Sequence, residues 1–261
     1  MNWEYNMKLQ YASDLHLEFL ENKEFLKINP LLPGGDVLLL AGDIVPFAVM
    51  AKHSDFFSYI SDTFKTTYWI PGNHEYYHSD ISSRTGSFNE KIRDNLFLVN
   101  NITVNQENVK LIFSTLWTNI SPGNQIEIRQ RLSDFHTIKY KNKGLTPDYY
   151  NLLHEQCRSF LNKELSKGGT EKKVIVTHHV PTFMNYPGKY KGDSLNEAFA
   201  VEMYNDVLRS DADFWIFGHH HSNTANFQIG STILTTNQLG YVIHNDCPGF
   251  DTKKIITILN D

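Results

Sequence analysis

Five short apolar runs in this chain each end in Asp, Asn or His, and this recurrence constrains the fold more than any other feature. Each run predicts a strand. The segments between the first three runs, and the segment before the fifth, are long enough for helices, and strand, helix, strand is the pattern of parallel pairing in an α/β sheet. The runs are "MKLQYASDLH" (7–16), "DVLLLAGD" (36–43), "TYWIPGNH" (67–74), "KKVIVTHH" (172–179) and "ADFWIFGHHH" (212–221).

Two segments have apolar residues at helical spacing, residues 46–65 and 194–210. The second begins with Ser194 and Glu197, which match the sequence pattern of a capping box. We therefore expect one helix over each of the two segments.

The later part of the chain is richer in strand patterns that lack long helical spacers. They indicate a second sheet, at least partly antiparallel. Two packed sheets with helices outside would use residues 1–261 as one domain, an α/β fold with two mixed sheets flanked by helices. The patterns are "NLFLVNNITV" (95–104), "VKLIFSTLWTNI" (109–120), "FQIGSTILTTN" (227–237), "LGYVIHN" (239–245) and "KKIITILN" (253–260).

Composition excludes several classes of function. The formal net charge of -5 argues against a general binder of long nucleic acid, because such binding needs a surplus of Lys and Arg. No apolar run approaches the roughly 18 residues that cross a bilayer, and the N-terminus lacks the apolar core of a leader. Cys157 and Cys247 form no C-x-x-C pair, which fits a reducing compartment. We expect a cytoplasmic protein with no membrane partner.

The polar residues that end the five runs are expected to meet. In an open α/β sheet, ligands bind beyond the carboxyl ends of parallel strands. Two of the runs also hold pairs at i, i+2, which an extended chain turns to one side, so Leu15 and His220 are spacers that point away. The residues expected at this edge are Asp14, His16, Asp43, Asn73, His178, His219 and His221.

This set holds two carboxylates, one amide oxygen and four imidazoles, which suit Mn, Fe or Zn. Two divalent ions could share the site if one carboxylate bridges them. Two such ions and two Asp carboxylates leave a charge of about +2, and a bridging hydroxide lowers it to about +1. The centre would attract a phosphate and supply the hydroxide as a nucleophile near neutral pH.

The same residues spell a pattern that resembles the calcineurin-like metallophosphoesterases. Its parts are D-x-H at 14–16, G-D at 42–43, G-N-H-E at 72–75, the strand ending in His178, and G-H-x-H at 218–221. They stand in the family's order and with its gaps, 27 positions from His16 to Asp43 and 30 from Asp43 to Asn73. The resemblance implies a four-layer α/β/β/α sandwich.

The resemblance also implies a role for each matching position. One metal ion would be held by Asp14, His16 and His221, the other by Asn73, His178 and His219, and Asp43 would bridge the two. His74 resembles the residue that contacts the phosphate and protonates the leaving oxygen, a general-acid step typically worth about 10²- to 10⁴-fold. His179, beside His178, is left as an alternative ligand.

One departure from the family narrows the subgroup. Protein Ser/Thr phosphatases of the family carry G-D-x-x-D-R-G, where this chain has "GDIVPFA" (42–48). The carboxylate partner of the catalytic histidine and a phosphate-clamping arginine are thus absent from their usual place. The strings "SDLHLEF" (13–19) and "THHVP" (177–181) are similar to those of small bacterial-type phosphoesterases.

The leading hypothesis is a metal-dependent hydrolase of a small phosphomonoester or phosphodiester. A cyclic-nucleotide phosphodiesterase or a nuclease is the alternative within catalysis, and an inactive scaffold for protein binding is the alternative of another class. Two segments could set specificity: 181–194, with Lys189 and Lys191, as a lid over the metals, and 116–136, with Arg129 and Arg131, as phosphate contacts or as a solvated helix. Surface or core positions are expected for His53, His78, His136, His154 and His244.

Overall fold

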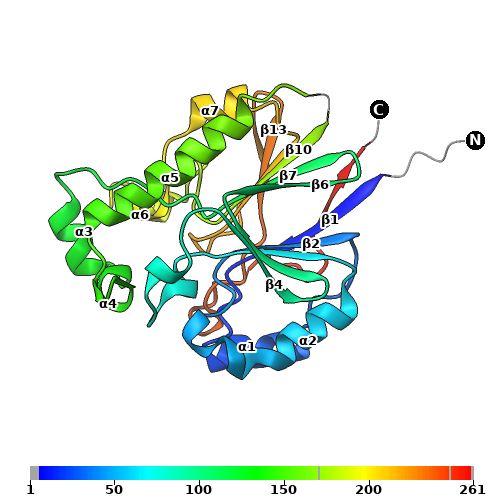
Figure 1. Ribbon diagram of the computed structural model, residues 1–261, viewed down its shortest axis with the longest axis horizontal. Helices are drawn as coiled ribbons and strands as arrows, with labels where there is room; N and C mark the ends of the chain where they lie inside the picture. The colour runs from blue at the N-terminus through cyan, green and yellow to red at the C-terminus, as the bar shows by residue number, and fades with distance from the viewer. Residues whose placement is uncertain (1–5, 170, 247, 260–261) are drawn as a thin grey trace, which may run out of the picture.

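The computed structural model describes residues 6–169, 171–246 and 248–259. Two sheets of six strands pack face to face in it (Figure 1). The first sheet has the order β14-β1-β2-β3-β5-β4, with β1, β2, β3 and β5 parallel and an antiparallel strand at each edge. Its strands are β1 (Met7–Ala12), β2 (Val37–Ala41), β3 (Thr67–Ile70), β4 (Phe88–Arg93), β5 (Leu96–Asn100) and β14 (Ile255–Ile258).

The second sheet repeats this plan in the order β12-β13-β11-β10-β7-β6. Its inner strands β7, β10, β11 and β13 are parallel, and β6 and β12 are antiparallel edges. The strands are β6 (Ile102–Gln106), β7 (Val109–Ser114), β10 (Lys172–Thr177), β11 (Phe214–Phe217), β12 (Phe227–Ile229) and β13 (Thr232–Thr236), and a separate ribbon joins β8 (Lys139–Tyr140) to β9 (Lys143–Gly144).

Helices cover the outer face of each sheet, so the predicted four-layer sandwich is confirmed (Figure 1). The apolar core between the sheets includes Leu39, Phe113 and Val176. The first sheet is covered by α1 (Leu20–Ile28), the 3-10 helix η1 (Phe47–His53) and α2 (Ser54–Thr63). The second packs with α3 (Gln125–Arg131), α4 (Asp134–Thr137), α5 (Pro147–Leu165), α6 (Asn196–Phe199) and α7 (Tyr204–Arg209), and the remaining 3-10 turns are η2 (His74–Tyr76), η3 (Ile81–Ser83), η4 (Gly188–Tyr190) and η5 (Val242–His244).

The predicted division of strands between the sheets is wrong for four of them. β5 and β14 belong to the first sheet rather than to the second, and β10 and β11 belong to the second rather than to the first. A strand pattern identifies a strand but not its partner, and β14 returns at the end of the chain to pair with β1. The predicted strand at 239–245 is also wrong. Left-handed backbone at Gly240 (φ 66) and Asn245 (φ 57) interrupts it, and the turn η5 forms instead.

The helix predicted at 46–65 is confirmed, beginning as the 3-10 helix η1. The single helix predicted at 194–210 is wrong, because the segment holds two short helices, α6 and α7. The capping box is wrong as well. The Glu197 carboxylate accepts hydrogen bonds from the Ser121 backbone N–H (2.8 Å) and from Asn124 Nδ2 (2.9 Å), so it ties this segment to the loop before α3.

Among the described residues, no helix combines the length and apolarity that a membrane span requires. Cys157, on α5, is a buried free thiol that belongs to the apolar core. Cys247 lies outside the described residues.

Candidate metal centre

The predicted site residues follow the carboxyl ends of five inner strands, three in the first sheet and two in the second. The prediction that all five runs belong to one sheet is therefore wrong. The strand ends that carry the site residues belong to two sheets, and they meet at one edge. The loops there are tied by backbone hydrogen bonds, such as Asp14 N–H to Gly42 O (2.9 Å) and Gly218 N–H to His178 O (2.9 Å). The second of these bonds lies within the second sheet, and the Asp14 carboxylate joins the sheets by accepting from the His219 N–H (3.0 Å).

A first cluster of donor atoms comprises Asp14, His16, Asp43 and His221, one atom of each lying within 4.8 Å of the others. His16 Nε2 and His221 Nε2 face each other at 3.0 Å. Asp14 Oδ1 lies 3.5 Å from His221 Nε2, and Asp43 Oδ2 lies 3.8 Å from His16 Nε2.

A second cluster comprises Asp43, His178 and His219. His178 Nε2 lies 3.0 Å from His219 Nδ1 and 3.4 Å from Asp43 Oδ2. The side-chain oxygen of Asn73 lies 3.2 Å from the same His178 nitrogen. Asp43 belongs to both clusters, which is the position of a bridging carboxylate.

The donor atoms fit divalent metal ions. Each cluster turns two imidazole nitrogens toward each other at 3.0 Å and sets carboxylate oxygens beside them. Two ligands at right angles, each about 2.1 Å from one ion, are about 3.0 Å apart. Nitrogen and oxygen donors without a thiolate suit Mn, Fe or Zn. The buried Nε2 of His219 also lacks a hydrogen-bond partner among the described residues.

The backbone of these residues is strained. The prediction that the i, i+2 pairs lie on extended chain is therefore wrong. The φ angles of Asp14, His16, Asp43, His219 and His221 are 55°, 47°, 55°, 79° and 46°. All five lie in the left-handed region, where non-glycine residues cost of order 1–3 kcal/mol each. The i, i+2 pairs therefore stand on turns after β1 and β11, not on extended chain.

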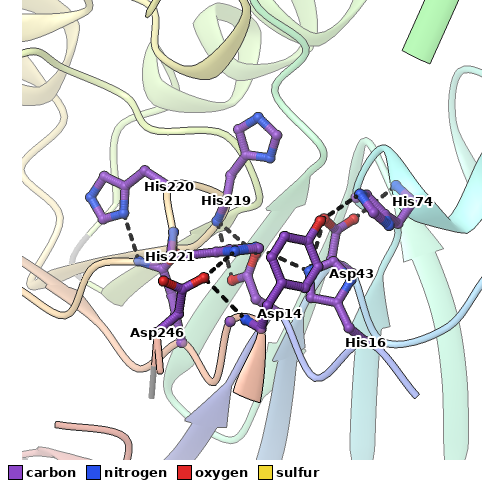
Figure 2. Close-up of polar contacts among 12 residues, drawn as sticks. Asp14, His16, Asp43, His74, His219, His220, His221 and Asp246 are labelled. Carbon is purple, nitrogen blue, oxygen red and sulfur yellow. Dashed lines mark hydrogen bonds and ion pairs between the residues drawn. The ribbon is translucent and has the colours of Figure 1, made fainter. Parts of the chain in front are cut away.

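His220 is separated from its two neighbours by this turn (Figure 2). Its ring is turned to the opposite side of the view from His16 and Asp43. Its Nδ1 accepts a hydrogen bond from Gln238 Nε2 (2.9 Å), and only 3% of the residue is exposed. His220 is thus a buried, hydrogen-bonded residue outside both donor clusters.

Of the two neighbouring histidines after β10, His178 faces the clusters. His178 Nδ1 hydrogen-bonds the Ala41 carbonyl (3.0 Å), which orients Nε2 toward Asp43. His179 turns the other way: its Nδ1 lies 3.2 Å from the Thr115 carbonyl and its Nε2 lies 3.4 Å from the Tyr150 hydroxyl. Burial and the neighbouring His178 lower the pKa of His179 to about 3, so it stays neutral.

His74 lies beside the clusters, at the cleft. Its backbone N–H donates to Asp43 Oδ1 (2.9 Å), and its ring stacks on Tyr77 with centroids 4.0 Å apart. Nδ1 lies 3.0 Å from Glu18 Oε1, and Nε2 lies 3.3 Å from the Tyr241 hydroxyl. Burial opposes the charged ring, but Asp43 and Glu18 outweigh it and raise the pKa of His74.

Three carboxylates that orient the candidate ligands are missing from the sequence-based prediction. Glu18 contacts His16 and His74, and it stands two residues after His16, at the spacing already used for D-x-H. Asp134 accepts from Asn73 Nδ2 (2.8 Å) and so fixes which side of that amide faces His178. Asp246 lies 3.4 Å from His221 Nδ1. No sequence motif surrounds the last two, so only the fold reveals them.

Glu75 joins two of the ligand-bearing loops. Its buried carboxylate accepts from the backbone N–H groups of Asp43 (2.9 Å), Ile44 (2.7 Å) and Gly72 (2.6 Å) and from Trp69 Nε1 (3.0 Å). Burial and the charge of Asp43 raise the pKa of Glu75 to about 8, whereas the four donors favour its ionised form. The hydrogen-bond geometry favours the carboxylate.

The clusters open into a cleft with a volume of about 670 Å³, whose lining includes Asp43, Asn73, His74, His219 and His221. The segment 181–194 contributes Tyr186, Tyr190 and Asp193 to one wall. Arg131 also lines the cleft, whereas Arg129 is exposed on α3. Tyr77 also lines the cleft, whereas the neighbouring His78 is exposed and is not among the lining residues.

Solved structures of other proteins superpose on this chain. A solved phosphopantetheinyl hydrolase from Mycobacterium tuberculosis superposes with a TM-score of 0.69 at 14% identity, covering 97% of this chain and 96% of that one, which shows a shared fold. A dimetal phosphatase from Danio rerio superposes with a TM-score of 0.42 at 11% identity, over 89% and 87% of the two chains.

A relative is also found by sequence. An uncharacterized protein of Acanthamoeba polyphaga mimivirus is 33% identical over 263 aligned positions, which cover 89% of this chain and 91% of the relative. The family model of the calcineurin-like phosphoesterases matches residues 7–223, the stretch that carries every candidate ligand. The chain therefore belongs to the calcineurin-like phosphoesterase family.

Proposed function

We propose that the protein hydrolyses a small phosphomonoester or phosphodiester at a centre of two divalent metal ions. The observation that carries this proposal is the sharing of Asp43 by two donor clusters that open into one cleft. The family supports phosphoester hydrolysis in general. The net charge of -5 supports a small ester over long nucleic acid.

Each donor cluster has a distinct role in the proposal. Asp14, His16 and His221 would hold one ion, Asn73, His178 and His219 the other, and Asp43 both. Such ions polarise a phosphoryl oxygen and make hydroxide available near neutral pH. Asp246 beside His221 and Asp134 beside Asn73 orient the ligands, as carboxylates behind metal ligands generally do.

His74 is the proposed general acid. In hydrolysis a water oxygen bonds to phosphorus, the bond from phosphorus to the leaving oxygen breaks, and the leaving oxygen takes up a proton. His74 lines the cleft beside both clusters, and its Nε2 is the ring nitrogen not engaged by Glu18. Glu18 thus stands where the missing G-D-x-x-D carboxylate would be needed, as the partner of this histidine.

Activity with simple esters tests the proposal. The protein is purified without chelators and assayed with Mn²⁺ on p-nitrophenyl phosphate and on bis(p-nitrophenyl) phosphate. Asp43→Ala should lose both metal and turnover, because its oxygens serve both clusters. His74→Ala should keep its metal and lose about 10²- to 10⁴-fold in kcat.

His136→Ala is the matched control, because His136 is exposed on α4 and belongs neither to the donor clusters nor to the cleft lining, and it should retain wild-type turnover. No turnover of either ester by the metal-loaded protein would contradict the enzyme proposal and favour the scaffold. Loss of metal from His74→Ala would contradict the division between ligands and acid.

A further inference from the structure

Six Phe and Tyr side chains line the cleft beyond the donor clusters. Two of them stack on histidines of the centre: Phe199 on His219, with centroids 4.5 Å apart, and Tyr77 on His74, with centroids 4.0 Å apart. Tyr241 meets His221 edge to face at 4.4 Å. The aromatic lining residues are Phe19, Tyr77, Tyr186, Tyr190, Phe199 and Tyr241.

Two of these rings belong to the segment that follows His178. Tyr186 packs against the ring of His220 with centroids 5.7 Å apart, and Tyr190 lies 6.1 Å from Tyr186. The segment is closed at its base, where the Val180 N–H donates to the Phe199 carbonyl (3.2 Å). Both tyrosines are half-buried and line the cleft, so they form part of its wall.

Within the described part of the chain, the residues that line the same walls include no unpaired Lys or Arg for a second anionic group. Arg131 is the one Lys or Arg among the described lining residues, and its guanidinium is engaged by Glu127 (2.6 Å) and Asp193 (3.1 Å). The lining acids Asp193 and Asp246 add negative charge. Lys189 is exposed outside the lining, with its ammonium 4.7 Å from the ring of Tyr190.

We infer that the organic part of the substrate is an uncharged aromatic group that packs against the tyrosines of this wall while the single phosphoryl group lies at the donor clusters. A volume of about 670 Å³ holds such a group, since small-molecule sites range over about 300–1,000 Å³. Aromatic walls favour a flat ring through stacked and edge-to-face packing. The paired arginine and two acids disfavour a second phosphate or a carboxylate. The inference rests on the proposed function.

Three esters of similar leaving alcohols separate the possibilities: benzyl phosphate, ethyl phosphate and 4-carboxybenzyl phosphate, assayed by phosphate release with Mn²⁺. We expect kcat/KM for benzyl phosphate to exceed that for ethyl phosphate about tenfold or more, mainly through KM. The 4-carboxybenzyl ester should lose most of this advantage. Competitive inhibition by benzylphosphonate and ethylphosphonate should show the same order, and it measures binding without chemistry.

Substitution of the two tyrosines tests whether they cause the preference for the benzyl ester. The double variant Tyr186→Ala/Tyr190→Ala should bring the benzyl-to-ethyl ratio of kcat/KM to within about threefold of unity. Tyr204→Ala is the matched control, since Tyr204 is exposed at the start of α7 and is not in the cleft lining, and it should keep the wild-type ratio.

The outcomes distinguish the two claims. No turnover of any of the three esters or of either p-nitrophenyl ester would overturn the proposed function. Turnover without preference for the benzyl ester, or a better 4-carboxybenzyl ester, would overturn the inference alone. A benzyl preference that survives the double tyrosine substitution would also overturn it, because the ring would then bind elsewhere.

Discussion

The carboxylate of Glu18 lies 3.0 Å from Nδ1 of His74, and it is the ionisable partner closest to this ring. The same oxygen lies 3.1 Å from Nδ1 of His16. One side chain thus orients a candidate ligand and the candidate acid together. Both rings then present Nε2 to the centre and the cleft.

Loss of the Glu18 charge should slow the reaction while leaving the metal in place. In Glu18→Gln an acceptor oxygen remains for both rings, but the carboxylate no longer stabilises a protonated His74. We expect kcat to fall about tenfold, with KM and metal content close to wild type, because substitution of residues behind a site typically costs about 10- to 100-fold. Steady-state kinetics and elemental analysis check this. Wild-type kcat in Glu18→Gln would refute the positioning role.

Gly72 leaves no room for a side chain in the G-N-H-E turn. A Cβ there would lie 2.6 Å from Cε1 and Nε2 of His178 and would press on the Asp43 carboxylate. Gly72→Ala should therefore lower the free energy of unfolding by about 1–3 kcal/mol and reduce metal binding. Urea denaturation and elemental analysis measure the two effects.

The control for Gly72→Ala is Gly123→Ala. A Cβ at Gly123 would meet no atom of the described residues within 4 Å, and this glycine precedes α3 on the surface. The variant should keep wild-type metal content and stability to within about 0.5 kcal/mol. Equal effects of the two substitutions would show that crowding at His178 is not the cause.

His154 should make stability depend on pH. It is buried in α5, where Nδ1 donates to the Trp117 carbonyl (2.7 Å), and burial lowers the pKa of His154 below its usual value. The unfolded chain gains a proton near pH 6.5, so it binds more protons than the folded chain below that pH, and stability falls as the pH falls.

His154→Gln keeps a donor for Trp117 but cannot titrate. Between about pH 7 and pH 5 we expect its free energy of unfolding to fall less than that of the wild type. Urea denaturation of both proteins after metal removal measures the difference, so that ions do not contribute. Parallel pH profiles would contradict the assignment to His154.

Substitution of His220 should lower stability but not metal content, unlike substitution of His219 or His221. His220→Ala removes one acceptor of Gln238 and leaves a cavity, so stability should fall by about 1–3 kcal/mol. Because the ring lies outside both donor clusters, metal content should stay at the wild-type level. Thermal denaturation and elemental analysis test the two parts. Loss of metal from this variant would contradict the position assigned to His220.

The fold and the centre could be predicted from the sequence to different depths. Runs such as 36–43 identify buried strands, and ordered motifs locate the candidate ligands, because these signals are local. The partners of β5 and β14, and the break of the 194–210 helix, depend on packing between distant segments. The longest helix, α5, is not among the predicted helices, although Thr146 caps it and Pro147 starts it.

The carboxylates that orient the candidate ligands could also be predicted only in part from the sequence. Glu18 could have been found, since it extends the D-x-H spacing by two residues. Asp134 could not, because it lies 61 positions from Asn73 and reaches it only through the packing of α4. The sequence predicts that the i, i+2 pairs share one side because the chain there is extended. In the structure, left-handed turns at Asp14, His16, His219 and His221 bring them together instead.

The central claim is that two donor clusters share Asp43 and each holds one ion. Elemental analysis of protein purified without chelators and saturated with Mn²⁺ tests it most directly. We expect about two ions per chain in the wild type, about one in His219→Ala, about one in His221→Ala and fewer than one in Asp43→Ala. Fewer than one ion per wild-type chain, or equal occupancy in all four proteins, would contradict it.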